Sequence, residues 1–146
     1  MKFTKGYWMN LPGVTNTDAV QVREVKVEND RVYLYTVPYH ADMRAMGGPL
    51  LEMYISSPQP DIIRTEAYHF MGSNQKMPAF ELNDAHCALE VENTETTVTI
   101  KSGNTKLVIG KNPCSFDYYY KDKKLTSIGN RFGNAMISTI STPDGN

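Results

Sequence analysis

The alternation of apolar and polar residues over residues 96–128 constrains the fold of this chain more than any other feature. Apolar side chains recur there at every second position, which is typical of strands that bury one face and expose the other. Ser102-Gly103 allows a positive φ at a turn, and Gly110 with Pro113 marks the next corner. We therefore predict two consecutive β-hairpins. The residues that the alternation places inward are Val98, Ile100, Leu107, Ile109 and Phe116.

The same pattern recurs along most of the chain. Residues 31–37 are rich in β-branched and aromatic residues, and they follow residues 20–28 across an Asn29-Asp30 turn, which predicts a further hairpin. A parity shift within residues 20–28 indicates a β-bulge. Many short strands separated by turn signals predict an all-β fold, an antiparallel sandwich or a barrel, with about eight or nine strands and no helix. The remaining predicted strands are residues 50–57, residues 61–70 and part of residues 85–92.

Glycine, proline and asparagine interrupt the strand pattern at several places. We expect the segment Pro58-Gln59-Pro60 to end a strand. Residues 14–19 are expected to be a loop, and residues 130–146 a loop or a frayed end.

Two longer segments, residues 38–49 and 71–78, are expected to be polar loops. Because loops of this kind often carry function, His40 and Arg44 are candidate site residues. The alternative interpretation is that residues 38–49 are a solvated connector between two strands.

Composition is ordinary for one globular domain that spans residues 1–146. The 146 residues include 15 basic and 16 acidic residues, which give a net charge of −1 with no block of either sign. A protein that binds a phosphate backbone should carry a basic face or stripe, so nucleic acid is not an expected partner.

No apolar run reaches the ~20 residues of a transmembrane helix, so we expect no membrane partner. The N-terminus lacks the apolar core of a signal peptide, which predicts a cytoplasmic protein. In that compartment Cys87 and Cys114 are expected to be free thiols, and a disulfide between them is the alternative.

Motifs that carry chemistry are missing from the sequence. There is no nucleophile elbow, glycine-rich phosphate loop or zinc-binding His-Glu-x-x-His sequence. The three histidines are isolated, and His69 falls in a predicted strand, where a hydrogen-bonded structural role is the simpler interpretation. A glycosidase needs two carboxyl groups held across a cleft, and the scattered acidic residues cannot be paired from sequence. We therefore predict no catalytic residue, no metal and no cofactor within this chain.

Several short motifs occur along the chain in a recognisable order. They are Met1-Lys2-Phe3, Gly6-Tyr7-Trp8, Pro12-Gly13, Val22-Arg23-Glu24-Val25, Phe70 after an Ile63-Arg64 strand, Glu92-Asn93-Thr94-Glu95, Lys101-Ser102-Gly103-Asn104 and Ser115-Phe116-Asp117-Tyr118. Over residues 1–136 this series resembles the start of the bacterial α-xylosidases of glycoside hydrolase family 31. The most specific part of the resemblance lies within residues 92–104.

The resemblance implies a β-sandwich of the galactose mutarotase-like type at the N-terminus of a retaining α-glycosidase that acts on α-xylosides or α-glucosides. In that family the sandwich precedes a (β/α)₈ barrel with two catalytic aspartates, which is the implied partner of this domain. The family's Gly-Leu-Gly-Glu-Arg-Phe motif does not occur in this sequence. No catalytic residue can therefore be carried over, and the chain is expected to be an excised, non-catalytic N-terminal portion.

The family resemblance leaves three roles open. The loops at residues 38–49 and 71–78 are the candidates for bordering a substrate cleft, and the candidate sugar contacts are Trp8, Tyr39, His40 and Arg44. Trp8 has the alternative role of anchoring the N-terminus to the core. A carbohydrate-binding module would instead need an exposed aromatic platform, for which the candidates are Trp8, Tyr39, Tyr68 and Tyr119. An interaction domain would form a homo-oligomer through an open sheet edge.

Overall fold

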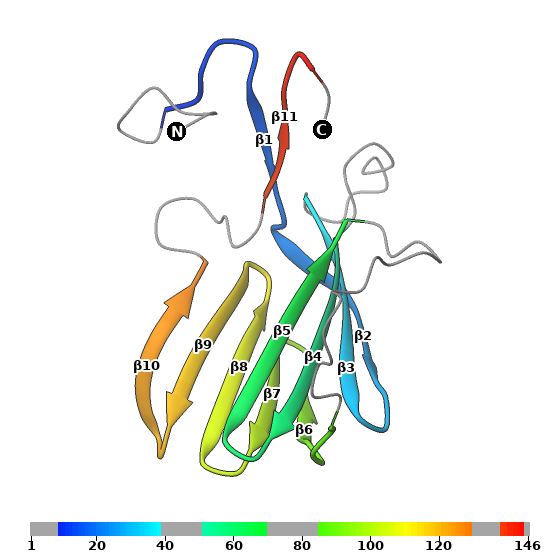
Figure 1. The fold of residues 1–146 in the computed structure, drawn as a ribbon, viewed down its shortest axis with the longest axis vertical. Coiled ribbons are helices and arrows are strands. Elements are labelled where there is room, and N and C mark those ends of the chain that lie inside the picture. The colour runs from blue at the N-terminus through cyan, green and yellow to red at the C-terminus, as the bar shows by residue number, and fades with distance from the viewer. Residues whose placement is uncertain (1–8, 39–50, 70–84, 130–137, 145–146) are drawn as a thin grey trace.

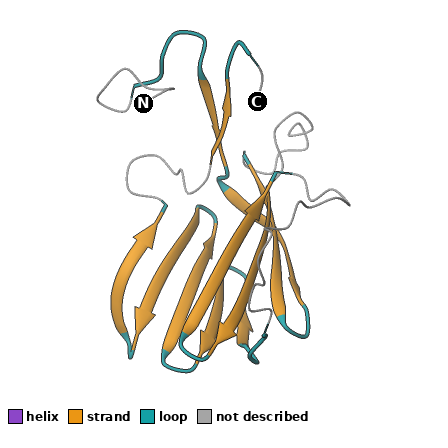
Figure 2. Cartoon of the chain, viewed as in Figure 1, coloured by secondary structure: helices purple, strands orange, loops and turns teal. Residues whose placement is uncertain are grey.

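Two antiparallel β-sheets lie face to face in the computed structural model, which describes residues 9–38, 51–69, 85–129 and 138–144 (Figure 1). One sheet has four strands in the order β2-β3-β4-β5, and the other has five in the order β10-β9-β8-β7-β6. The described residues contain no helix (Figure 2). The predicted all-β antiparallel sandwich is therefore confirmed.

Each sheet is a simple meander, because every pair of neighbouring strands is also consecutive in the sequence. The four-stranded sheet comprises β2 (Gln21–Val27), β3 (Arg31–Val37), β4 (Leu51–Gln59) and β5 (Ile62–Tyr68). The five-stranded sheet comprises β6 (Glu90–Asn93), β7 (Thr97–Ser102), β8 (Thr105–Lys111), β9 (Cys114–Tyr120) and β10 (Lys123–Ile128). Both predicted hairpins of residues 96–128 are present.

Alternate residues of both sheets form one apolar core between them. Burial of this apolar surface is the main force that holds the sheets together. All five residues that the alternation predicted to point inward belong to the core, and each is at most 1% exposed. The core residues are Val22, Val32, Leu34, Met53 and Ile55 from one sheet and Val98, Ile100, Leu107, Ile109, Cys114 and Phe116 from the other.

Polar contacts join the two sheets at the end where their hairpin turns meet. The backbone N–H of Asn104 donates a hydrogen bond to the Asp61 carboxylate. Thr105 Oγ1 donates to the Asp61 carbonyl oxygen at 2.6 Å. Gly103 has a φ of +57°, and a Cβ at this position would lie 2.3 Å from Asp61 Oδ1. The turn therefore needs glycine both for its backbone conformation and for the close approach of Asp61.

Three expectations were wrong: two concern segments expected to be loops, and the third is the number of strands. Residues 14–19 and 130–146 are not simply loops, because β1 (Thr15–Asp18) pairs with β11 (Ser138–Ser141) in a separate two-stranded sheet. The described residues thus hold eleven strands, more than the eight or nine expected. The segment Pro58-Gln59-Pro60, in contrast, ends a strand as expected, because β4 stops at Gln59. Pro58 itself lies within β4. The register between β4 and β5 shifts between Ser56 and Gln59, and this irregular pairing accommodates Pro58, which has no N–H to donate.

Other expectations were met. The β2–β3 register shifts between Val22 and Glu24, which confirms the bulge inferred from the parity of the sequence. Cys87 is half-buried, Cys114 is buried, and both are free thiols, as expected. Burial raises the pKa of the Cys114 thiol to about 12, so this group stays protonated and unreactive at neutral pH.

An open sheet edge, on which the oligomer hypothesis depends, is present at β10. All six residues of this edge strand are exposed. Its register with β9 shifts between Lys124 and Thr126, and Lys123 and Lys124 add positive charge. Bulges and lysines on an edge strand disfavour pairing with a second chain.

We predict that Phe116→Ala lowers the free energy of unfolding by about 3–5 kcal/mol, because it removes the largest fully buried side chain and leaves a cavity between the sheets. Urea denaturation monitored by circular dichroism measures the change. Leu125→Ala is the matched control, since Leu125 is 61% exposed, and its effect should stay within about 0.5 kcal/mol. Equal effects of the two substitutions would contradict the core described here.

Candidate functional site

The outer face of the four-stranded sheet carries a cluster of tyrosines and charged residues, which we call the tyrosine face. The cluster follows from the alternation that builds the core. Because Leu34 and Met53 point inward, their neighbours Tyr33 and Tyr54 point outward, and the register places these two tyrosines opposite each other. The tyrosine face comprises Lys26, Arg31, Tyr33, Glu52, Tyr54, Ser56, Arg64, Glu66 and Tyr68.

Three tyrosine rings contact one another across β3, β4 and β5. The ring centroids of Tyr33 and Tyr54 are 5.3 Å apart with an interplanar angle of 53°. Those of Tyr54 and Tyr68 are 6.0 Å apart at 68°, an edge-to-face arrangement. Tilted contacts of this kind are the favourable geometry for aromatic pairs. The rings are consequently inclined to one another and do not form a flat platform.

Two cations lie over these rings. The guanidinium carbon of Arg31 is 4.5 Å from the centroid of Tyr54, and Lys26 Nζ is 5.3 Å from that of Tyr33. Both distances are within the range of a cation–π attraction. A hydrogen bond also orients the Arg31 guanidinium, because its Nε donates to Glu28 Oε2 at 2.6 Å. That hydrogen bond is the main reason that the pKa of the Arg31 guanidinium is raised.

Carboxylates accept hydrogen bonds from the tyrosine hydroxyl groups. Tyr33 donates to Glu52 Oε1 at 3.1 Å, and Tyr68 donates to Glu66 Oε1 at 3.0 Å. Burial raises the pKa of the Tyr33 phenol to about 12, with a further contribution from the hydrogen bond to Glu52. The tyrosines of this face are thus ordered by polar partners within the domain itself.

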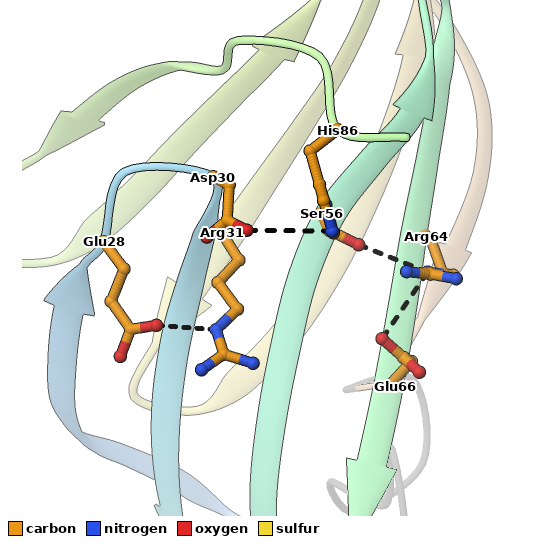
Figure 3. Close-up of polar contacts among 7 residues, drawn as sticks. All are labelled: Glu28, Asp30, Arg31, Ser56, Arg64, Glu66 and His86. Atoms are coloured by element: carbon orange, nitrogen blue, oxygen red, sulfur yellow. Dashed lines mark hydrogen bonds and ion pairs between the residues drawn. The ribbon is translucent and has the colours of Figure 1, made fainter. Parts of the chain in front are cut away.

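Further polar contacts extend the tyrosine face toward the β2–β3 turn (Figure 3). Arg64 Nε donates to Ser56 Oγ at 3.2 Å and lies 3.5 Å from Glu66 Oε2. His86 Nε2 lies 3.7 Å from Asp30 Oδ2. Positive and negative groups therefore alternate over this side of the domain.

The outer face of the five-stranded sheet is different in kind. Its cations are lysines: Lys124 Nζ lies 2.8 Å from Asp117 Oδ1, and Lys106 Nζ lies 5.0 Å from the centroid of the Tyr119 ring. A pocket of about 130 Å³ opens among the residues around Glu90 and Lys101. This volume is below the roughly 300–1,000 Å³ of typical small-molecule sites. The pocket is not a convincing ligand site.

The described parts of the two faces hold no cluster of metal-binding side chains. Among residues 9–38, 51–69, 85–129 and 138–144, no three His, Cys, Asp or Glu side chains approach closely enough to hold a metal ion. On the tyrosine face, Glu52 and Glu66 accept hydrogen bonds from tyrosines. These contacts order the surface. The same part of the chain contains no helix that is long and apolar enough to cross a membrane.

The candidate sugar contacts fall outside the described residues. These are Trp8, Tyr39, His40 and Arg44. The two loops expected to border a substrate cleft also fall outside the described residues, except for Pro38 at the start of residues 38–49. Of the residues proposed for an aromatic platform, Tyr68 lies on the tyrosine face and Tyr119 lies on the opposite side of the sandwich. Of the proposed residues, the two that the structure describes are therefore on separate faces.

Sequence reasoning missed most of the tyrosine face, including Tyr33, Tyr54 and Arg31. One signal was available, since the alternation in residues 31–37 leaves Arg31 and Tyr33 on the polar side of their strand. Their contact with Tyr54 depends on the β3–β4 register, which the sequence of either strand alone does not contain.

Solved structures share this fold over most of the chain, although no protein family model matches it. The uncharacterized protein lmo2446 from Listeria monocytogenes EGD-e matches with a TM-score of 0.65 and 18% sequence identity. Cycloalternan-forming enzyme from Listeria monocytogenes, in complex with a pentasaccharide substrate, matches with the same TM-score and identity. Each match covers 90% of this chain and 11% of the matched chain. At an identity this low, the similarity shows a shared fold and nothing more. The chain spans about one ninth of the length of these proteins.

We predict that Glu52→Gln lowers the pKa of Tyr33, because the substitution removes a charge that opposes ionisation of the phenol. The pKa should remain above the ordinary value of 10.0, since burial is the larger cause of the shift from 10.0 to about 12. Ultraviolet absorbance titration measures it, with Tyr33→Phe identifying the signal of this residue.

The raised pKa of Tyr33 also makes the free energy of unfolding depend on pH, because the folded protein holds the phenol proton more tightly than the unfolded chain does. The contribution to stability is complete below the unfolded value of 10.0 and is lost as the pH rises toward 12. An unchanged titration in Glu52→Gln would contradict the contact between Glu52 and Tyr33.

Proposed function

We propose that this chain is a non-catalytic β-sandwich domain of a larger glycoside hydrolase and packs against the catalytic domain of the same polypeptide. The observation that carries the proposal is the shared fold with cycloalternan-forming enzyme, in which the matched region is 11% of the chain. The resemblance of residues 92–104 to family 31 α-xylosidases supports the same conclusion independently.

The proposed parent enzyme is a cytoplasmic retaining α-glycosidase that acts on α-xylosides or α-glucosides. Its double-displacement mechanism uses one carboxylate as nucleophile and a second as general acid and base. Both groups would belong to the catalytic domain, because in the family that residues 92–104 resemble the two catalytic aspartates lie in the barrel. We further propose that Trp8, Tyr39, His40 and Arg44 border the substrate cleft of that enzyme.

We predict that this chain alone hydrolyses neither aryl α-xylosides nor aryl α-glucosides. The polypeptide translated from the complete reading frame should hydrolyse one of them with retention of anomeric configuration. Release of the aryl group measures turnover, and nuclear magnetic resonance of the first-formed sugar identifies the anomer. Turnover by a homogeneous preparation of this chain, or an inactive full-length polypeptide, would overturn the proposed function.

A carbohydrate-binding module is the second candidate function. The observation in its favour is the association of Tyr68 with Tyr54 and Glu66, since aromatic rings and carboxylates both contact sugars. The three tyrosines do not form a flat surface on which a sugar ring could stack, because adjacent rings are inclined and the Arg31 guanidinium lies over the ring of Tyr54. The scaffold function is therefore the better supported of the two.

We predict that xylose- and glucose-containing oligosaccharides bind this chain with dissociation constants no tighter than about 1 mM. Isothermal titration calorimetry is the measurement. Tighter binding that is lost in Tyr68→Ala and retained in Tyr119→Ala would favour the module, because these two tyrosines lie on opposite sides of the sandwich.

A further inference from the structure

We infer that the tyrosine face is the surface through which this domain docks on the catalytic domain of the same polypeptide. This inference rests on the proposed function and adds the identity of the contact surface.

The two outer faces differ in the residue types that distinguish protein interfaces from solvated surfaces. The tyrosine face presents three contacting tyrosines together with Arg31 and Arg64. Tyrosine and arginine are enriched at protein–protein interfaces and account for a large share of binding energy there. The opposite face presents Lys106 and Lys124 beside the single tyrosine Tyr119, and lysine is depleted at interfaces. Lys26 is the one lysine among the residues that define the tyrosine face.

The side chains of the tyrosine face are already ordered in the domain. Tyr54 is held between Tyr33, Tyr68 and the Arg31 guanidinium. Binding a partner costs conformational freedom for every flexible side chain that becomes fixed. A surface whose aromatic groups are fixed beforehand loses less on docking, so this order favours a protein contact.

Charge on the tyrosine face also fits a protein surface better than a charged small molecule. Lys26, Arg31 and Arg64 are balanced by nearby carboxylates, including Glu66, which lies 3.5 Å from Arg64 Nε. A surface with both signs interleaved has no net attraction for phosphate or for a polyanion. It complements a partner surface that is itself a mixture of acidic and basic groups.

The occupant that we assign is the remainder of the parent polypeptide. In the solved structures that share this fold, the matched region is 11% of the chain. A domain that is so small a part of a long chain has a neighbouring domain within reach without any separate binding partner. A second copy of this chain and a bound sugar are the competing occupants, and the experiment distinguishes them.

Hydroxyl-radical footprinting with mass spectrometry measures the exposure of each tyrosine side chain without any substitution. The isolated chain is compared with the full-length polypeptide. We expect oxidation of Tyr54 and Tyr68 to fall several-fold in the full-length polypeptide. Tyr119, which is half-buried on the opposite face, is the internal control and should change little.

Each outcome has a definite meaning. Unchanged oxidation of Tyr54 and Tyr68, or protection of Tyr119 in their place, would overturn the docking assignment. Protection that appears in the isolated chain as its concentration rises would show a second copy as the occupant. Protection that requires added oligosaccharide would show a sugar. If the full-length polypeptide is inactive on glycosides but still protects Tyr54 and Tyr68, the docking surface stands and the proposed function fails.

Discussion

Apolar contact between the two sheets is the constraint on which the other features of this domain depend. Every strand of the sandwich that contributes to the core does so with alternate residues, such as Leu34 of β3 and Ile109 of β8. The remaining residues of those strands are thereby forced onto the two outer faces. The tyrosine face is thus a direct consequence of the core. A slip of one residue in β3 would bring Tyr33 inward and expose Leu34, which the burial of Leu34 strongly opposes.

The two outer faces show how one scaffold supports two kinds of surface. Three contacting tyrosine rings and two arginines lie on one side, whereas the other side has lysines paired with aspartates and the ring of Tyr119. Nothing in the core requires this difference, because outward positions contribute little to the packing between the sheets. The asymmetry is therefore better explained by what each side contacts than by folding, and this makes the four-stranded sheet the more informative side.

The fold was predictable wherever apolar residues alternate over a whole strand. The strands β7, β8 and β9 meet this condition, and their inward residues were assigned correctly. β1 and β11 do not meet it, since their sequences TNTD and STIS are short and mostly polar. Their pairing joins distant segments and leaves no local signal. The tyrosine face was missed for a related reason, because the contact between Tyr33 and Tyr54 depends on register between strands. Trp8, Tyr39, His40 and Arg44 lie outside the described residues.

The pairing of β1 with β11 has a consequence for the order in which the parts of the domain fold. It places Thr15 opposite Ser141, so it closes a loop that contains nearly the whole chain, whereas both meanders pair only consecutive strands. Closing a longer loop costs more entropy, and non-local contacts slow folding. The two meanders can therefore form first and the terminal ladder last. Local unfolding of the β1–β11 pair would release both terminal strands while the two packed sheets stay folded.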